Sequence, residues 1–195
     1  GIMTPAEVQF IARAFDLETA GSQGYNGFYG VLAHYISLEF LHPQIRAMGG
    51  AYGTDMSLQR SGLGVLTSYR DPNLQRTLDI FKTLPDWLRQ HIPDGATLLP
   101  FIIGSVNQFD PPLTPSGKAE TALSLYLSGL SRADIEQALA QALASGPASF
   151  AGWPELLERA LQAPPHICVV GNTATLKALP QGSLTLRQLE PNHLD

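Results

Sequence analysis

Arg46 and Tyr52 are the residues of this chain whose types and spacing best suit catalysis. They stand six positions apart around the stretch Gly49-Gly50-Ala51-Tyr52-Gly53, at an expected junction between a helix and a strand. A guanidinium and a phenol brought together there could both donate hydrogen bonds to a carbonyl oxygen that gains negative charge. The structural alternative is an arginine that caps its helix and a half-buried tyrosine that begins the strand. Taken alone, the two residues favour that alternative.

The glycine-rich stretch 49–53 could also hold a phosphate group through its backbone N–H groups. It lacks the Gly-Lys-Ser/Thr ending of a P-loop, and it precedes expected strands rather than a helix. A turn whose glycines adopt positive φ angles is the simpler interpretation.

The other reactive side chains form no recognisable catalytic or metal-binding motif. No two histidines are separated by four positions, and neither H-E-x-x-H nor H-x-x-E-H nor G-x-S-x-G occurs. His34 falls within an apolar helical pattern and is expected to be a core or edge histidine. Cys168 falls within the apolar run 167–170 and is expected to be a buried, unreactive thiol. We therefore expect no metal site in this chain and no complete active site.

Composition indicates one soluble domain of ordinary type. The chain has 195 residues, a net charge of −5, 44% hydrophobic residues and one cysteine. The acidic excess argues against nucleic acid or an anionic membrane as a partner. No apolar run approaches the roughly 18 residues of a membrane span, and no secretory signal opens the chain. Residues 1–6 resemble a start in mid-protein or an expression scar.

The first half of the chain predicts a strand, a helix and a hairpin. Residues 8–15 predict a strand, and the spacing from Phe28 to Leu38 predicts a buried helix that ends near Pro43 or restarts over residues 44–48. Residues 55–60 and 63–69 predict a hairpin around Ser61-Gly62. This order is common in α+β sandwiches.

The second half is predicted to be mostly helical. Helical spacing runs through Leu74, Leu78 and Phe81, and Asp94 is a plausible N-cap for a helix whose expected core stripe is Leu99, Ile102, Ile103 and Val106. Ser131–Asp134 resembles a capping box, and Pro154 suits the first turn of a further helix. Residues 167–170 predict a buried strand, after which Asn172 is expected to cap a short helix. Residues 71–73 and 110–112 are interpreted as turns, with Asp71 or Asn73 as a helix cap.

Four sequence blocks, taken in order, resemble one family of peptidases. Residues 41–53 resemble the LxxxIRxxGGAYG segment of pitrilysin/insulinase-type zinc peptidases, most similar to the presequence-protease-like branch. The other blocks are residues 68–74, 102–105 and 110–115. Their order and spacing resemble the last domain of that branch over almost the whole chain.

This resemblance implies a fold and a division of labour. The fold would be an α+β two-layer sandwich of pitrilysin/mitochondrial-processing-peptidase type, a mainly antiparallel sheet covered on one face by helices, with residues 1–195 forming one C-terminal domain. Such enzymes resemble two halves that close around a peptide chamber, with zinc bound in the first domain by an H-x-x-E-H helix and a distal Glu. By motif position, Arg46 and Tyr52 would reach the peptide substrate at that zinc. Zinc polarises the scissile carbonyl and activates water.

Two alternatives stay open at this point. The chain could belong to a non-catalytic subunit that pairs with a zinc-bearing one, or to an interaction or scaffold domain whose Arg46 and Tyr52 meet no substrate. An H-x-x-E-H motif upstream in the same gene product would favour the peptidase. The compartment is also open, because the resemblance extends to organellar and bacterial enzymes.

Overall fold

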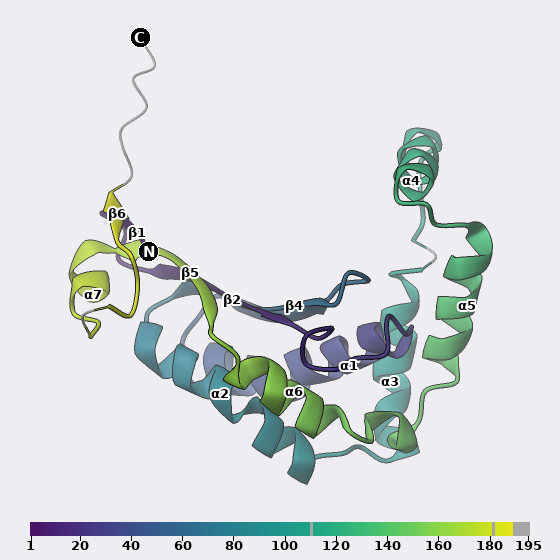
Figure 1. Ribbon diagram of the computed structural model, residues 1–195, viewed down its shortest axis with the longest axis horizontal. Helices are drawn as coiled ribbons and strands as arrows, with labels where there is room; N and C mark the ends of the chain where they lie inside the picture. The colour runs from purple at the N-terminus through teal and green to yellow at the C-terminus, as the bar shows by residue number, and fades with distance from the viewer. Residues whose placement is uncertain (110, 181, 189–195) are drawn as a thin grey trace.

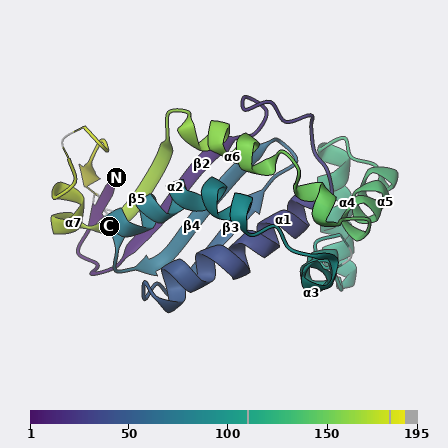
Figure 2. The same cartoon turned by 90° about the horizontal axis from the view of Figure 1, so that it is seen from below.

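Six strands form one sheet, and helices cover one of its two faces (Figures 1 and 2). The computed structural model describes residues 1–109, 111–180 and 182–188. The strands are β1 (Ile2–Thr4), β2 (Gln9–Asp16), β3 (Gly53–Leu58), β4 (Leu63–Asp71), β5 (His166–Asn172) and β6 (Arg187–Gln188). The α-helices are α1 (Phe28–Ile36), α2 (Leu74–Gln90), α3 (Gly95–Val106), α4 (Pro115–Leu127), α5 (Arg132–Leu143), α6 (Trp153–Gln162) and α7 (Thr173–Lys177). A π-helix, η1 (Ser37–Ala47), continues α1, and a 3-10 turn, η2 (Pro147–Phe150), precedes α6.

The sheet has the order β3-β4-β2-β5-β1-β6 and confirms the expected α+β class. The pairs β3–β4, β4–β2 and β2–β5 are antiparallel, and β1 lies parallel to both β5 and β6. The sequence predicts no strand or helix within residues 1–6. Ile2–Thr4 nevertheless form strand β1, in which Ile2 pairs with Val170 and Met3 with Gly171.

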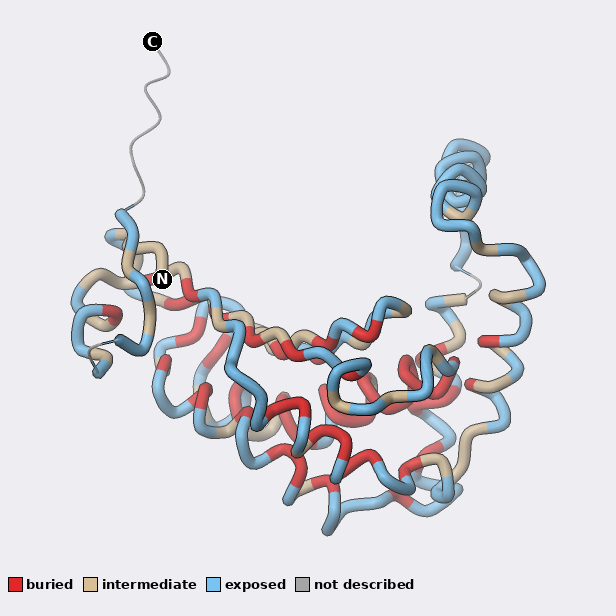
Figure 3. The backbone as a smooth tube through the Cα atoms, viewed as in Figure 1, coloured by how far each residue is buried: buried red, intermediate tan, exposed pale blue. Residues whose placement is uncertain are grey.

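Strand β2 shows how the two faces of the sheet differ. Ile11, Arg13 and Phe15 are buried beneath the helices, whereas Phe10, Ala12 and Ala14 on the opposite face are half-buried. Figure 1 shows α1, α2 and α6 on one side of the sheet, and in the described residues no helix covers the other side (Figure 1). We call that second side the open face. Figure 3 shows the burial of the helix-covered side.

The core lies between the covered face and these helices. Phe81, Leu84 and Leu88 of α2 and Leu157 of α6 are fully buried against it. Burying a side chain of this size stabilises the fold by about 1.5–3 kcal/mol. Among the described residues, no helix is long and apolar enough to cross a membrane.

The helix that begins at Phe28 does not end at Pro43. It continues as the π-helix η1 to Ala47, with Pro43 inside it. Proline lacks an N–H group, so a change of helical hydrogen bonding accommodates it. Leu38, which was expected on the buried side, is 46% exposed. This longer helix carries Arg46 in its last turn.

Two predictions of burial were wrong. In α3 the buried residues are Leu98, Phe101, Ile102 and Ser105, whereas Leu99 and Ile103 are exposed. The helix is rotated because α3 packs on α1 and α5 rather than under the sheet. Cys168 is exposed because it points to the open face of β5, while its neighbour Val169 points to the core.

The predicted first residues of helices α3, α5, α6 and α7 are confirmed. The side chain of Asp94 accepts a hydrogen bond from the Thr97 N–H, and that of Asn172 accepts from Ala174 and Thr175. Ser131 and Asp134 form a capping box at the start of α5. Pro154 lies in the first turn of α6. Asp110, part of a predicted turn, lies outside the described residues.

Candidate functional site

Arg46 and Tyr52 flank one tight backbone junction between η1 and β3. The Gly50 N–H donates to the Arg46 carbonyl (2.9 Å), and the Ala51 N–H donates to the Ile45 carbonyl (3.1 Å). Ile45 and Ala51 are buried, so the loop is anchored on the core on both sides. The Tyr52 N–H then donates to the Tyr69 carbonyl (3.0 Å), which begins the pairing with β4. The backbones of both predicted residues therefore have fixed positions.

Two glycines make this junction possible. Gly50 has φ +81°, a left-handed conformation that costs other residues energy. A Cβ atom on Gly49 would lie 2.3 Å from the Ile45 carbonyl oxygen, which is part of the backbone. The first glycine is required for close approach and the second for its φ angle, which agrees with the interpretation of the stretch as a turn.

The side chains of Arg46 and Tyr52 extend to different neighbours. Both are exposed, and Tyr52 is 70% exposed. Arg46 Nη1 lies 2.5 Å from His42 Nε2, one helical turn earlier. The Tyr52 ring packs edge-on against the Tyr69 ring, with centroids 5.8 Å apart. The hydrogen bonds of the described residues include none between Arg46 and Tyr52.

Tyr52 belongs to a row of aromatic rings on the open face. Tyr69 is half exposed and lies between Tyr52 and Phe10, whose ring centroid is 5.1 Å away in an edge-on arrangement. Edge-on pairs of this kind are worth about 0.5–1.5 kcal/mol each beyond their buried area. The row limits the positions that the Tyr52 ring can take.

A buried carboxylate holds the end of β4 beside this junction. Asp71 is fully buried, and its Oδ2 accepts hydrogen bonds from Ser68 Oγ (2.5 Å) and Thr77 Oγ1 (2.6 Å). Its Oδ1 accepts from the Asn73 N–H (2.7 Å). The Asn73 side chain donates in turn to the Gly49 carbonyl. These contacts, which we call the Asp71 hub, connect β4 and α2 to the glycine loop.

Arg70 shows that the hub imposes a conformation on the chain. Its φ angle is +50°, and it is the only non-glycine with positive φ among the described residues. Such a conformation costs about 1–2 kcal/mol and persists only where the surroundings determine it. Asp71 beside it supplies those surroundings. The turn predicted at residues 71–73 is therefore held by Asp71, while Arg70 is exposed next to Tyr69.

The described residues do not form a metal site. No three His, Cys, Asp or Glu side chains among them lie close enough to hold a metal ion. His34 packs its ring edge-on against Phe101 in a partly buried position. The His34 ring also packs closely against Gly104. A Cβ atom on Gly104 would lie only 2.1 Å from the ring. The one cysteine, Cys168, is exposed and alone.

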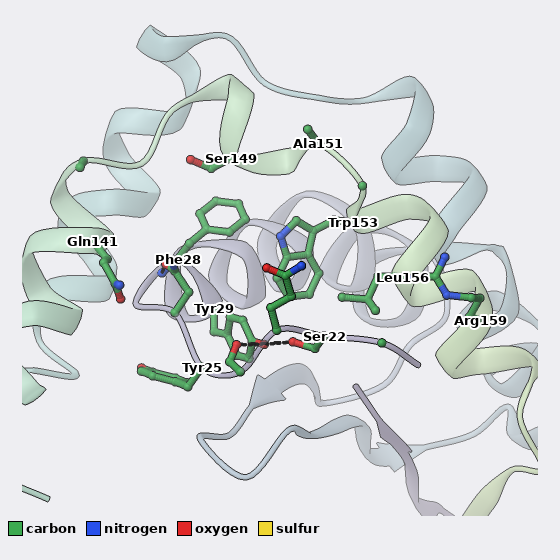
Figure 4. Close-up of a pocket in the computed structure, with 16 residues that line it drawn as sticks. Ser22, Tyr25, Phe28, Tyr29, Gln141, Ser149, Ala151, Trp153, Leu156 and Arg159 are labelled. Atoms are coloured by element: carbon green, nitrogen blue, oxygen red, sulfur yellow. Dashed lines mark hydrogen bonds between the residues drawn. The ribbon is translucent and has the colours of Figure 1, made fainter. Parts of the chain in front are cut away.

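A cavity of about 850 Å³ lies elsewhere, between the loop at residues 21–26 and the start of α6 (Figure 4). Figure 4 shows Tyr25, Phe28, Tyr29 and Trp153 gathered in it, with Ser22 hydrogen-bonded to Tyr29. Burial raises the pKa of Tyr25. The guanidinium of Arg60, which lies over the Tyr25 ring, offsets part of this rise. Neither Arg46 nor Tyr52 lines this cavity, so it is not the site that the sequence predicts.

Three residues of the site were missed by the sequence analysis. His42 stands four positions before Arg46, a spacing that places two side chains together on a helix. Tyr69 lies opposite Gly53 in the β3–β4 register, which the hairpin prediction could have supplied. Asn73 gives no local signal, because its partner Gly49 is distant in the sequence.

Comparison with known proteins identifies the family. The model of the family "PreP C-terminal domain" matches residues 1–170. Protein HypA of Clostridium perfringens is 28% identical over 177 residues, which are 91% of this chain and 18% of that protein. Presequence protease 1, chloroplastic/mitochondrial, of Arabidopsis thaliana is 29% identical over 158 residues, 80% of this chain and 14% of that protein. The chain thus spans less than a fifth of the length of either relative.

A solved structure supports the fold independently. Pitrilysin superposes with a TM-score of 0.59 and 14% identity, over 97% of this chain and 21% of the pitrilysin chain. The chain belongs to the PreP C-terminal domain family, within the pitrilysin/insulinase-type (M16) metallopeptidases.

Proposed function

We propose that this chain acts as the C-terminal domain of a zinc-dependent endopeptidase that degrades unstructured peptides in a closed chamber. Its part would be to contact the substrate and the transition state through Arg46 and Tyr52, while the metal is bound by the N-terminal half of the same enzyme. The observation that carries the proposal is the junction of η1 and β3, where two exposed hydrogen-bond donors extend from a backbone held by the hydrogen bonds of Gly50, Ala51 and Tyr52.

The chemistry of these donors suits peptide hydrolysis. Attack on a peptide carbonyl places negative charge on its oxygen, and donors already in position stabilise that charge most effectively. The Tyr52 hydroxyl would donate to this oxygen. The Arg46 guanidinium, which carries a permanent charge and several donors, would hold the substrate backbone or the Tyr52 hydroxyl itself. The aromatic row would keep the phenol in its position.

Zinc would have to come from another part of the enzyme. The described residues of this chain do not fit a zinc site, which needs at least three side-chain ligands. When bound, zinc supplies a polarised carbonyl and an activated water. The partners implied are therefore the zinc-bearing half and a peptide.

Recombination of the two parts tests this division of labour. The 195-residue chain and the remainder of its parent protein are produced separately, and zinc content and cleavage of a fluorogenic peptide are measured for each and for the mixture. We expect zinc in the remainder alone and cleavage in the mixture. A chain with Tyr52→Phe should bind the remainder equally well and restore far less cleavage.

Tyr126→Phe is the matched control, since Tyr126 is an exposed tyrosine on α4 with no role in the junction. Zinc-dependent cleavage by the isolated chain would contradict the proposal. A parent protein that lacks an H-x-x-E-H motif would indicate instead a non-catalytic subunit or a scaffold domain.

A further inference from the structure

Arg13 is a buried charge that the proposed peptidase role does not use. It lies in the middle of β2, points to the helix-covered face and is 4% exposed. Its neighbours in the sheet are Leu66 and Ile167, which are both apolar. Burial lowers the pKa of the guanidinium, yet arginine stays protonated in proteins. A positive charge therefore lies between apolar sheet neighbours, on a side chain that also lines a cavity.

The contacts of Arg13 account for only part of its hydrogen-bonding capacity. Its Nη2 donates to the Leu161 carbonyl at 2.6 Å, in the last turn of α6. The C-terminal end of a helix carries partial negative charge and favours a cation. This contact therefore offsets some of the free-energy cost of burying the guanidinium. It uses one of five N–H groups. Arg13 takes part in no ion pair with the described acidic residues, although buried charges are normally paired.

Arg13 is one of the residues that line a cavity of about 270 Å³. Its lining residues come from β2, β5, α2 and the segment after α7. Figure 2 shows α2 crossing the helix-covered side of the sheet, opposite the aromatic row. The polar residues that line the cavity are Arg13, Gln75, Lys82 and Ser183. Lys82 is 60% exposed and pairs with Asp79, whose carboxylate also accepts hydrogen bonds from the Gln75 side chain.

The rest of the lining is apolar. Leu78 of α2, Ile167 of β5 and Leu184 contribute hydrocarbon surface to the same cavity. Ligand sites of small molecules combine this kind of apolar wall with a few polar groups that fix orientation. A guanidinium matches a carboxylate in shape and charge, because two parallel N–H groups can bind its two oxygens.

We propose that this cavity, here called the Arg13 cavity, binds a small organic carboxylate that bears a short apolar chain. The carboxylate would accept hydrogen bonds from Arg13 and would be further attracted by Lys82. The apolar chain would lie against Leu78 and Ile167. Such a group occurs both in free aliphatic acids and in the C-terminal residue of a peptide.

Ligand-dependent stability of the 195-residue chain tests the proposal. Thermal unfolding and calorimetric titration are measured with hexanoate, with N-acetyl-leucine as the mimic of a peptide C-terminus, and with hexanamide as the neutral control. We expect saturable binding and a raised Tm with at least one carboxylate, and none with hexanamide. The tighter binder of the two carboxylates identifies the source.

Two variants link the binding to the cavity. Arg13→Met, which keeps the length of the side chain without its charge, should lower affinity at least tenfold. Lys82→Gln changes an exposed residue and should lower affinity a few-fold in a chain that folds normally, which keeps the test valid if the first variant misfolds. Equal affinity in the wild type and both variants would overturn the proposal. So would the absence of any carboxylate-dependent shift in Tm, since Arg13 would then serve only to cap α6.

Discussion

Two adjacent glycines decide where the proposed catalytic donors lie. Gly49 allows the loop to pass against the Ile45 carbonyl, and Gly50 turns it through a positive φ angle. Both features could be expected from a glycine-rich stretch between a helix and a strand. The orientation of the Tyr52 and Arg46 side chains could not, because it depends on Tyr69 and on a π-helical turn that local sequence does not specify.

Gly50→Ala should lower the free energy of unfolding by about 1–2 kcal/mol, since a Cβ is unfavourable at φ +81°. Chemical denaturation of the chain measures the change. Gly53→Ala is the matched control, because its Cβ would make only an ordinary contact, 3.9 Å from Tyr69 Cβ. Equal effects of the two substitutions would show that the φ angle of Gly50 is not the constraint.

At the level of elements, the Asp71 hub connects β4, α2 and the glycine loop. The sequence predicts a turn there, with Asp71 or Asn73 as a helix cap. Asn73 occupies the N-cap position of α2 but makes no side-chain cap, and it binds Gly49 instead. Contacts between distant segments of this kind have no local pattern, so sequence periodicity could not reveal them.

Asp71→Ala should destabilise the chain by roughly 2 kcal/mol or more, because it leaves the buried hydroxyls of Ser68 and Thr77 without their acceptor. Asp86→Ala is the control, since that side chain is 75% exposed and should change stability by less than about 0.5 kcal/mol. Denaturant midpoints provide the comparison. Similar values for the two variants would mean that the hub is not required for stability.

The capping box of α5 should depend on pH. The Ser131 hydroxyl and N–H donate to the Asp134 carboxylate, and this lowers the pKa of Asp134 in the folded chain. A lowered folded pKa gives stability that is present above the unfolded value, near 3.9, and is lost as pH falls through the folded value. Wild type should therefore exceed Asp134→Asn in stability at pH 7, with the difference shrinking below about pH 4. A difference that is constant with pH would rule out the carboxylate as its cause.

Over the whole molecule, the features that could be predicted from the sequence are those that depend on contacts between residues close together in the chain. The β3–β4 hairpin, the helix caps at Asp94 and Ser131 and the class of the fold have short-range signals, and the structure confirms them. The short strands β1 and β6 lack such signals, because their parallel partners are far away in the chain. The rotation of α3 and the exposure of Cys168 likewise depend on which elements cover them.

At the scale of the whole molecule, the two faces of the sheet differ in what covers them. Helices cover one face, the aromatic row and Tyr52 occupy the other, and α4 has no buried residue at all. These surfaces agree with the proposed role of the chain as one domain of a larger enzyme, and the chain spans less than a fifth of the two relatives compared above. The absence of a metal cluster among the described residues is then compatible with metallopeptidase membership, because the metal would belong to another domain.

The kinetic effect of Tyr52→Phe in the full-length parent protein tests the central claim most directly. Loss of one hydrogen-bond donor to the transition state should lower kcat for peptide cleavage by about 10²–10³. KM and zinc content should change little, because the donor acts on the reacting oxygen. An unchanged kcat with a raised KM would contradict the account and would reduce Tyr52 to ordinary substrate binding.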